Sequence, residues 1–146
     1  MILLDTNVIS ETLRERPDPV VSAWLDEFPE EELWTASVVI AELLSGIELM
    51  PSGRKQKGLR EAVEHMIIED FRGQILTFNL PAARQYAHIL ASRKKIGRPI
   101  RELDAQIAAI ANVHGATLAT RDVNDFAGCN LAVVNPWDRN VKVTAG

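Results

Sequence analysis

Four acidic residues follow or interrupt apolar segments, and this placement indicates metal chemistry. Asp5 directly follows the apolar run Ile2–Leu4, and Asp122 follows a second such run late in the chain. Glu42 and Asp104 each lie in a segment that is otherwise apolar or built mostly from small residues. A buried carboxylate costs several kcal/mol unless it is paired or binds a metal, and clustered carboxylates raise each other's pKa. A hard divalent cation, Mg²⁺ or Mn²⁺, resolves both difficulties because it prefers oxygen ligands.

Each acid also has a purely structural explanation. Asp5 and Asp122 could each cap a helix. Glu42 could form a buried ion pair with an arginine, and Asp104 could be a surface acid stabilised by the helix dipole. A shared site is favoured because Asp5 and Asp122 follow two different strands of one predicted parallel sheet, and ligands bind at the carboxyl ends of such strands.

A divalent ion held by carboxylates indicates phosphate chemistry, since it can activate a bound water and neutralise a phosphodiester during in-line displacement. No residue stands out as a general base: the histidines, at positions 65, 88 and 114, lie outside the acidic segments. Two basic clusters could bind phosphates or could be solvated helix faces. They comprise Arg54, Lys55, Lys57 and Arg60, then Arg93, Lys94, Lys95, Arg98 and Arg101.

Other candidates are weaker. Arg121, beside Asp122, could contact substrate. The three tryptophans, Trp24, Trp34 and Trp137, could stack bases, but core or interface packing is the simpler interpretation. We expect Cys129 to be a packing residue.

The composition is that of a globular domain. The chain has 146 residues, of which 47% are hydrophobic and 25% charged. One cysteine excludes a disulfide framework and an all-cysteine zinc site. No apolar run approaches the roughly 18 residues of a membrane span, which predicts a cytoplasmic protein. The net charge of −4 disfavours general nucleic-acid binding, although four acids in one pocket would account for the whole excess.

Short apolar runs alternate with helical patterns, which predicts parallel βα units. The expected strands are 2–4, 33–35, 75–78, 116–119 and 131–134. Helices are expected over about 6–13, 54–71 and 102–113. Three further helices are expected to begin after Asp18, at a cap formed by Ser37, and near Pro81. The sequence therefore predicts an α/β sandwich of about five parallel strands with helices on both faces. A single domain over 1–137 and a tail over 138–146 are expected.

Four segments together resemble the PIN-domain family, in particular the VapC-like and FitB-like ribonuclease toxins of bacterial type II toxin–antitoxin pairs. They are Ile2–Val8, Ala41–Leu43, Asp104–Ala109 and Thr120–Phe126. The likeness runs from Asp5 to Trp137, and the order and spacing of the four segments make it specific.

The resemblance implies a three-layer PIN fold and an endoribonuclease that depends on Mg²⁺ or Mn²⁺. It implies that Asp5, Glu42, Asp104 and Asp122 form the catalytic, metal-holding quartet. Supporting positions fall on Thr6, Asn7, Thr120 and Asp125. The candidate RNA contacts come from the basic residues near these segments, and they are Arg93, Lys94, Lys95, Arg98, Arg101 and Arg121. It also implies a homodimer, neutralised by an antitoxin that binds operator DNA.

Two other functions stay open from the sequence. An acidic phosphatase or phosphotransferase could use Asp5 as a covalent nucleophile, although the haloacid-dehalogenase signature needs a second aspartate where Asn7 stands. A non-catalytic module could use the acids only to hold an ion or to bind a basic partner.

Overall fold

A parallel sheet forms the centre of the computed structural model, which describes residues 1–138 and 144–145. Its parallel strands are β1 (Ile2–Leu4), β2 (Leu33–Ala36), β3 (Ile75–Leu76), β4 (Thr117–Ala119) and β5 (Ala132–Val134), in the order β3-β2-β1-β4-β5. The prediction of five parallel strands is confirmed. The third strand is two residues long and so ends earlier than expected.

A sixth strand, β6 (Thr144–Ala145), pairs antiparallel with β5 at the sheet edge. It lies within the segment expected to be a tail, and no apolar run in the sequence marked it. The division into a domain over 1–137 and a tail over 138–146 stays a prediction, because residues 139–143 and 146 lie outside the described part of the chain.

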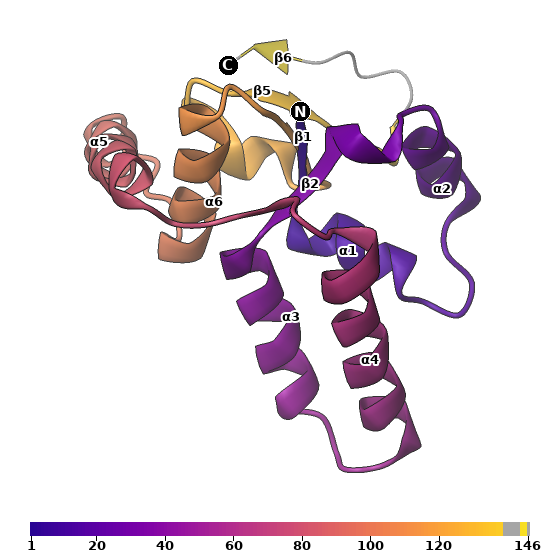
Figure 1. The fold of residues 1–146 in the computed structure, drawn as a ribbon. Helices are drawn as coiled ribbons and strands as arrows, with labels where there is room; N and C mark the ends of the chain where they lie inside the picture. Colours follow the sequence, from indigo (N-terminus) through magenta and orange to yellow (C-terminus); the bar gives the residue numbers. More distant parts are fainter. Residues whose placement is uncertain (139–143, 146) are drawn as a thin grey trace.

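Helices connect the strands. They are α1 (Thr6–Thr12), α2 (Pro19–Asp26), α3 (Ser37–Glu48), α4 (Arg54–His65), α5 (Leu80–Lys95) and α6 (Glu102–Val113). A π-helical turn (Met66–Asp70) continues α4, so the helix expected over 54–71 is present. The helices α5 and α6 lie on one side of the strands, and α1 and α2 lie on the other (Figure 1).

Three of the six helices α1 to α6 begin at a residue whose side chain caps them. The side chains of Asp5, Asp18 and Asn79 accept backbone N–H groups at the starts of α1, α2 and α5. The expected Ser37 cap is wrong: Ala36 is the N-cap residue, and Ser37 is already the first residue of α3. The extended backbone of β2 runs directly into this helix, so no loop residue is left to serve as a cap.

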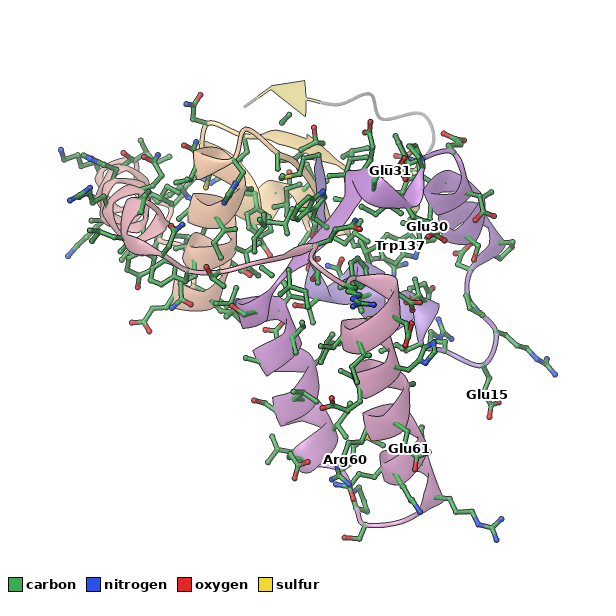
Figure 2. All side chains as sticks on the ribbon, in the orientation of Figure 1. Glu15, Glu30, Glu31, Arg60, Glu61 and Trp137 are labelled. Carbon is green, nitrogen blue, oxygen red and sulfur yellow. The ribbon has the colours of Figure 1, made fainter. Side chains whose placement is uncertain are left out.

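The helices α3 and α4 lie side by side and project beyond the strands (Figure 1). Arg60 on α4 donates to Glu48 on α3 across a 2.8 Å ion pair near the outer end of the two helices (Figure 2). The first basic cluster of the sequence therefore lies on this projection.

Small residues bring α6 close to the sheet. Its buried residues include Ala105, Ala108, Ala109 and Ala111, all fully inaccessible, and small side chains permit close packing. This close packing fixes the first turn of α6 near the strand ends. Within residues 1–138 and 144–145, no helix combines the length and the apolar character that a membrane span requires.

The strand order reverses at β1, which has β2 on one side and β4 on the other. In open parallel sheets such a reversal leaves a crevice at the carboxyl ends of the two central strands, because the connections leave in opposite directions. Asp5 follows β1 and Thr120 follows β4. The topology therefore brings these two residues together although 115 positions separate them.

Candidate active site

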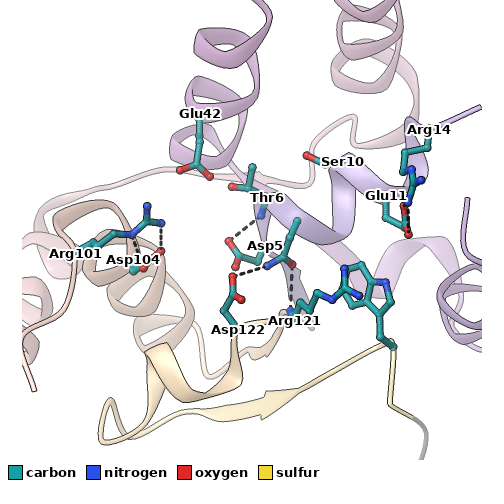
Figure 3. Close-up of a pocket in the computed structure, with 12 residues that line it drawn as sticks. Asp5, Thr6, Ser10, Glu11, Arg14, Glu42, Arg101, Asp104, Arg121 and Asp122 are labelled. Carbon is teal, nitrogen blue, oxygen red and sulfur yellow. Dashed lines mark hydrogen bonds and ion pairs between the residues drawn. The ribbon is translucent and has the colours of Figure 1, made fainter.

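A cavity of about 480 Å³ opens at this carboxyl edge of the sheet. The four acids expected to act together all line it (Figure 3): Asp5, Glu42, Asp104 and Asp122. They come from four places, namely the end of β1, the middle of α3, the first turn of α6 and the segment after β4. The surface-acid explanation fails for Asp104, whose side chain is buried.

Asp5 is the most buried of the four, with 5% of its surface exposed. Its Oδ1 accepts the backbone N–H of Thr6 at 2.8 Å, and its Oδ2 accepts the hydroxyl of Thr120 at 2.7 Å. Asp5 thus caps α1 and also faces the cavity, so the capping and site interpretations both hold. Burial raises the pKa of Asp5 to about 6, and the charges of Asp104 and Glu42 add to the rise, while the two hydrogen bonds oppose it.

Thr120 and Asn7 join Asp5 to Asp122. The buried Thr120 hydroxyl, which donates to Asp5, accepts from Asn7 Nδ2 at 3.2 Å and from the Asp122 backbone N–H at 3.1 Å. Asn7 Nδ2 also donates to Asp122 Oδ2 at 3.1 Å, and Asn7 Oδ1 accepts the Arg121 N–H at 3.2 Å. This network fixes the side of the cavity formed by the strand ends. Asp122 itself is exposed, and its side chain caps no helix.

Asp104 is held differently. Both of its oxygens accept from Arg101, at 3.0 Å from Nε and 3.1 Å from Nη2. The arginine side chain is mostly exposed, whereas the carboxylate is buried. Asp104 raises the pKa of Arg101 further, with Glu42 and Asp125 adding to the effect. Arg101 is therefore the counter-cation of this side of the cavity.

Glu42 is half-buried. It forms no hydrogen bond or ion pair with another described residue, so the arginine partner that would have explained it structurally is not found among residues 1–138. Its carboxylate reaches toward the Arg101–Asp104 pair from α3 (Figure 3). The side chain is thus available for a ligand in the cavity.

The sequence interpretation missed part of the cavity wall. Ser10 and Glu11 line it from α1, and Arg14 lines it from the turn that follows this helix. Glu11 is buried and pairs with Arg14 at 3.1 Å. The sequence could have predicted this wall, because Asn7, Glu11 and Arg14 follow the i, i+4, i+7 spacing that places residues on one face of a helix.

The basic residues divide into two groups. Arg101 and Arg121 line the cavity. Lys94, Lys95 and Arg98 are exposed but lie outside its lining.

The expectation that Arg93 contacts RNA is contradicted, because its side chain is only 4% exposed. It donates to the backbone oxygens of Arg98, Asp125 and Ala127 at 2.6, 2.6 and 3.0 Å. Arg93 therefore connects the turn between α5 and α6 to the loop after Asp122 through these hydrogen bonds.

The remaining candidates lie outside the cavity or pack. Asp125 is exposed and is not part of the lining. Cys129 is buried, and burial raises the pKa of its thiol, which fits the expected packing role. Trp24 packs edge-on against Phe28. None of the three histidines lines the cavity.

The donor set fits a hard divalent cation by its chemistry. Every candidate ligand is an oxygen, and the Thr6 hydroxyl oxygen is buried with no hydrogen-bond partner at the same cavity. In the described part of the chain, no three His, Cys, Asp or Glu side chains are already arranged around one ion. Each Asp104 oxygen accepts one hydrogen bond from Arg101 and keeps a further lone pair that could bind a metal ion.

Comparison with known proteins agrees with this geometry. Residues 2–127 match the PIN domain family, and the chain belongs to it. It is 44% identical to Toxin FitB of Neisseria gonorrhoeae, covering 94% of this chain and 99% of that protein. It is 39% identical to VapC ribonuclease Y4jK of Sinorhizobium fredii, with the same coverage of 94% and 99%.

Solved structures give the same result. The crystal structure of FitAcB from Neisseria gonorrhoeae superimposes with a TM-score of 0.87 at 44% identity, covering 94% of this chain and 99% of that one. A chain in the structure of FitAB bound to an IR36 DNA fragment gives a TM-score of 0.88 at 43% identity, covering 94% and 96%. The three-layer α/β arrangement expected from the sequence is confirmed.

Proposed function

We propose that this protein is a divalent-metal-dependent endoribonuclease and the toxin of a type II toxin–antitoxin pair. The convergence of Asp5, Glu42, Asp104 and Asp122 on one cavity is the observation that carries the proposal. The names of the relatives, a toxin and a VapC ribonuclease, support the reaction and the biological setting.

The four carboxylates would hold Mg²⁺ or Mn²⁺. When bound, such an ion supplies a water of lowered pKa and neutralises charge on the phosphodiester. Thr120 and Asn7 keep Asp5 and Asp122 in place by the hydrogen bonds described above. Arg14, Arg101 and Arg121 line the same cavity, where their guanidinium groups can contact phosphate oxygens. No histidine is among the described residues that line the cavity, so the lining offers no imidazole as a general base.

The covalent alternative, with Asp5 as a nucleophile, is less well supported. Both Asp5 oxygens already accept hydrogen bonds, from Thr6 and from Thr120. Only 5% of the surface of Asp5 is exposed. These contacts stabilise a fixed ligand rather than a group that must move to attack.

An antitoxin partner belongs to the proposal. The similar structures include FitAB bound to DNA, which supports operator binding through the antitoxin. A second groove, of about 1250 Å³, adjoins the acidic cavity and shares Thr6, Ser10, Arg14 and Glu42 with it. Its apolar wall comes from α3 and α4, including Leu43, Ile47 and Leu59, which suits an amphipathic segment of the antitoxin.

The proposal also includes a homodimer and a cytoplasmic location, where RNA and the antitoxin would both be present. Light scattering of the purified protein tests the first point, with twice the chain mass as the expected result. A protein that remains monomeric at all concentrations would contradict it.

The reaction is tested with protein freed of any antitoxin, stripped of metal by EDTA and incubated with labelled RNAs. Cleavage should return with Mg²⁺ or Mn²⁺ and should be absent in the Asp5→Asn variant. Intact RNA in all samples, together with tight binding of a protein partner, would instead support the non-catalytic module. Hydrolysis of a small phosphomonoester while RNA stays intact would support the phosphatase.

A further inference from the structure

Arg121 and Trp137 form a planar surface at the wall of the acidic cavity. The Arg121 Cζ atom lies 4.8 Å from the centroid of the Trp137 ring, in a cation–π contact. Both residues line the cavity, and Arg121 is labelled in Figure 3. Among the described residues, Trp137 is the only aromatic side chain in this lining.

Trp137 is held in place by its own turn. It follows β5, the neighbour of β4, so the turn comes at the same carboxyl edge of the sheet as Asp5. The Trp137 backbone N–H donates to Asn135 Oδ1 at 2.9 Å, and the Asp138 N–H donates to the Asn135 carbonyl oxygen at 3.1 Å. Pro136, which is buried, fixes the backbone between them. These contacts fix the backbone of the turn that carries the Trp137 ring.

The face of the Arg121 guanidinium that points away from Trp137 is available to a ligand. The residue is exposed, and its guanidinium forms no ion pair or hydrogen bond with any other described residue. Its backbone N–H donates to Asn7 Oδ1, the residue that also binds Asp122. The backbone of Arg121 is thus fixed beside Asp122, a proposed metal ligand. One face of its guanidinium packs on the Trp137 indole, and the other face is free to contact a ligand in the cavity.

The other tryptophans are used differently. Trp34 donates from Nε1 to the Glu31 carbonyl oxygen at 3.1 Å, and Trp24 packs against Phe28 with ring centroids 4.9 Å apart. Neither lines the acidic cavity. Packing, which was the simpler interpretation for all three from the sequence, holds for each of them, because all three pack against the core. Trp137 differs in that it also lines the cavity.

We propose that Arg121 and Trp137 form a stacking subsite for one nucleobase of the RNA substrate, next to the phosphate that is cut. The base lies on the exposed plane of the Arg121 guanidinium, and Trp137 supports that plane from behind. This inference rests on the proposed function and deepens it. Because a base must leave its neighbours to stack on protein, the subsite selects unpaired nucleotides.

The subsite contributes in two separable ways. The positive charge of Arg121 attracts phosphates whatever their base, and this effect weakens with salt. The planar guanidinium on its indole recognises the base face, which is a short-range contact and is almost insensitive to salt. A lysine at position 121 retains the first contribution and loses the second.

The binding experiment uses the Asp5→Asn variant, which should bind RNA without cutting it, with Trp24 and Trp34 both changed to Phe so that Trp137 alone fluoresces. Short single-stranded oligoribonucleotides are compared with versions that carry one abasic ribose at each position in turn. We expect RNA to quench Trp137, and an abasic ribose at one position to weaken binding about tenfold. Arg121→Lys should bind every version alike, while the matched Arg72→Met change, at an exposed arginine outside the cavity lining, should leave the pattern intact.

Cleavage kinetics give a second test that retains all three tryptophans. For the same set of oligonucleotides, Trp137→Leu and Arg121→Lys should raise KM about tenfold with little change in kcat, and Trp137→Phe should restore most of the loss. If every abasic version binds and is cut like the intact one, the stacking subsite is wrong. If the unmutated protein cuts no RNA at all, the proposed function is wrong, whatever the fluorescence shows.

Discussion

The two sides of the acidic cavity are built on different principles. On the side formed by the strand ends, Asp5 and Asp122 are joined through Thr120 and Asn7 by hydrogen bonds between neutral donors and carboxylates. On the side formed by the helices, Asp104 is held by a single exposed arginine, and Glu42 has no bonded partner among the described residues.

This difference in bonding indicates which side of the cavity is preorganised for a ligand. Hydrogen bonds from buried neighbours on rigid elements fix the Asp5 carboxylate before any ligand arrives. An ion pair with an exposed arginine contributes little stability and can exchange its partner. The strand-end side is therefore preorganised, and the helix side adjusts when the cavity is filled.

The largest expected effect is loss of cleavage when one acid is removed from either side. Asp5→Ala and Asp104→Ala should each lower kcat/KM by about 10³-fold or more, since each removes a carboxylate that would hold the metal ion next to the reacting phosphate. Neither change should greatly destabilise the fold, because Arg101 is already exposed and loss of Asp5 removes a carboxylate that is costly to bury.

Thermal unfolding of the same preparations controls for misfolding. If both variants fold and still cut RNA at the unmutated rate, the two acids are not part of the mechanism. If only Asp104→Ala stays active, the chemistry depends on the preorganised side alone.

A second prediction concerns the pH dependence of stability in metal-free protein. Burial raises the pKa of Asp5 from 3.8 to about 6, so between these values the folded state holds a proton that the unfolded state has lost. The contribution of Asp5 to the free energy of unfolding is therefore highest below pH 4 and falls as the pH rises through 6. The shift corresponds to about 3 kcal/mol.

Asp5→Asn has no such proton to lose, so its stability should show about 3 kcal/mol less decline over this range. Urea unfolding in EDTA at several pH values, with both proteins side by side, measures the difference. Equal pH profiles would mean that the Asp5 carboxylate is better solvated than its 5% exposure indicates.

Much of this site could be predicted from the sequence. Asp5 was predictable because it ends an apolar strand, and Glu42 and Asp104 because each charge interrupts an apolar helix. The β6 strand was not predictable in the same way, since its pairing with β5 depends on a long-range contact rather than on a hydrophobic pattern.

Arg93 shows where local patterns mislead. The run Arg93-Lys94-Lys95 has the composition of a solvated face, yet Arg93 follows the buried Ile89 by one helical turn and so lies on the inner face of α5. Its burial is possible because three backbone oxygens accept from it, and these partners come from loops that the sequence alone does not place.

A third prediction addresses the preorganised side. Thr120→Val removes the donor to Asp5 and the acceptor of Asn7 Nδ2 at nearly constant volume. We expect metal affinity or kcat/KM to fall about 10- to 100-fold, the usual cost of losing a group that orients a ligand. Calorimetric titration with Mn²⁺ on the metal-free protein measures the affinity directly.

Thr120→Ser retains the hydroxyl and should recover most of this loss. Asp125→Asn is the matched control, because Asp125 is exposed and outside the cavity lining, and it should change either quantity less than about twofold. A larger effect of Asp125→Asn would return this residue to the supporting role that the sequence resemblance implies.

The smallest expected effect concerns the helix side of the cavity, and here the substitution should strengthen metal binding instead of weakening it. Arg101→Gln removes the ion pair that holds Asp104 and one positive charge from the cavity, so Mn²⁺ should bind about tenfold more tightly, a difference of about 1.4 kcal/mol. Arg98→Gln is the control, since Arg98 is exposed and contacts a backbone oxygen of Asn124 rather than an acid. Weaker Mn²⁺ binding by Arg101→Gln would show that the arginine positions Asp104 for the metal instead of competing with it. Both sides of the cavity would then be preorganised, one by hydrogen bonds and the other by charge.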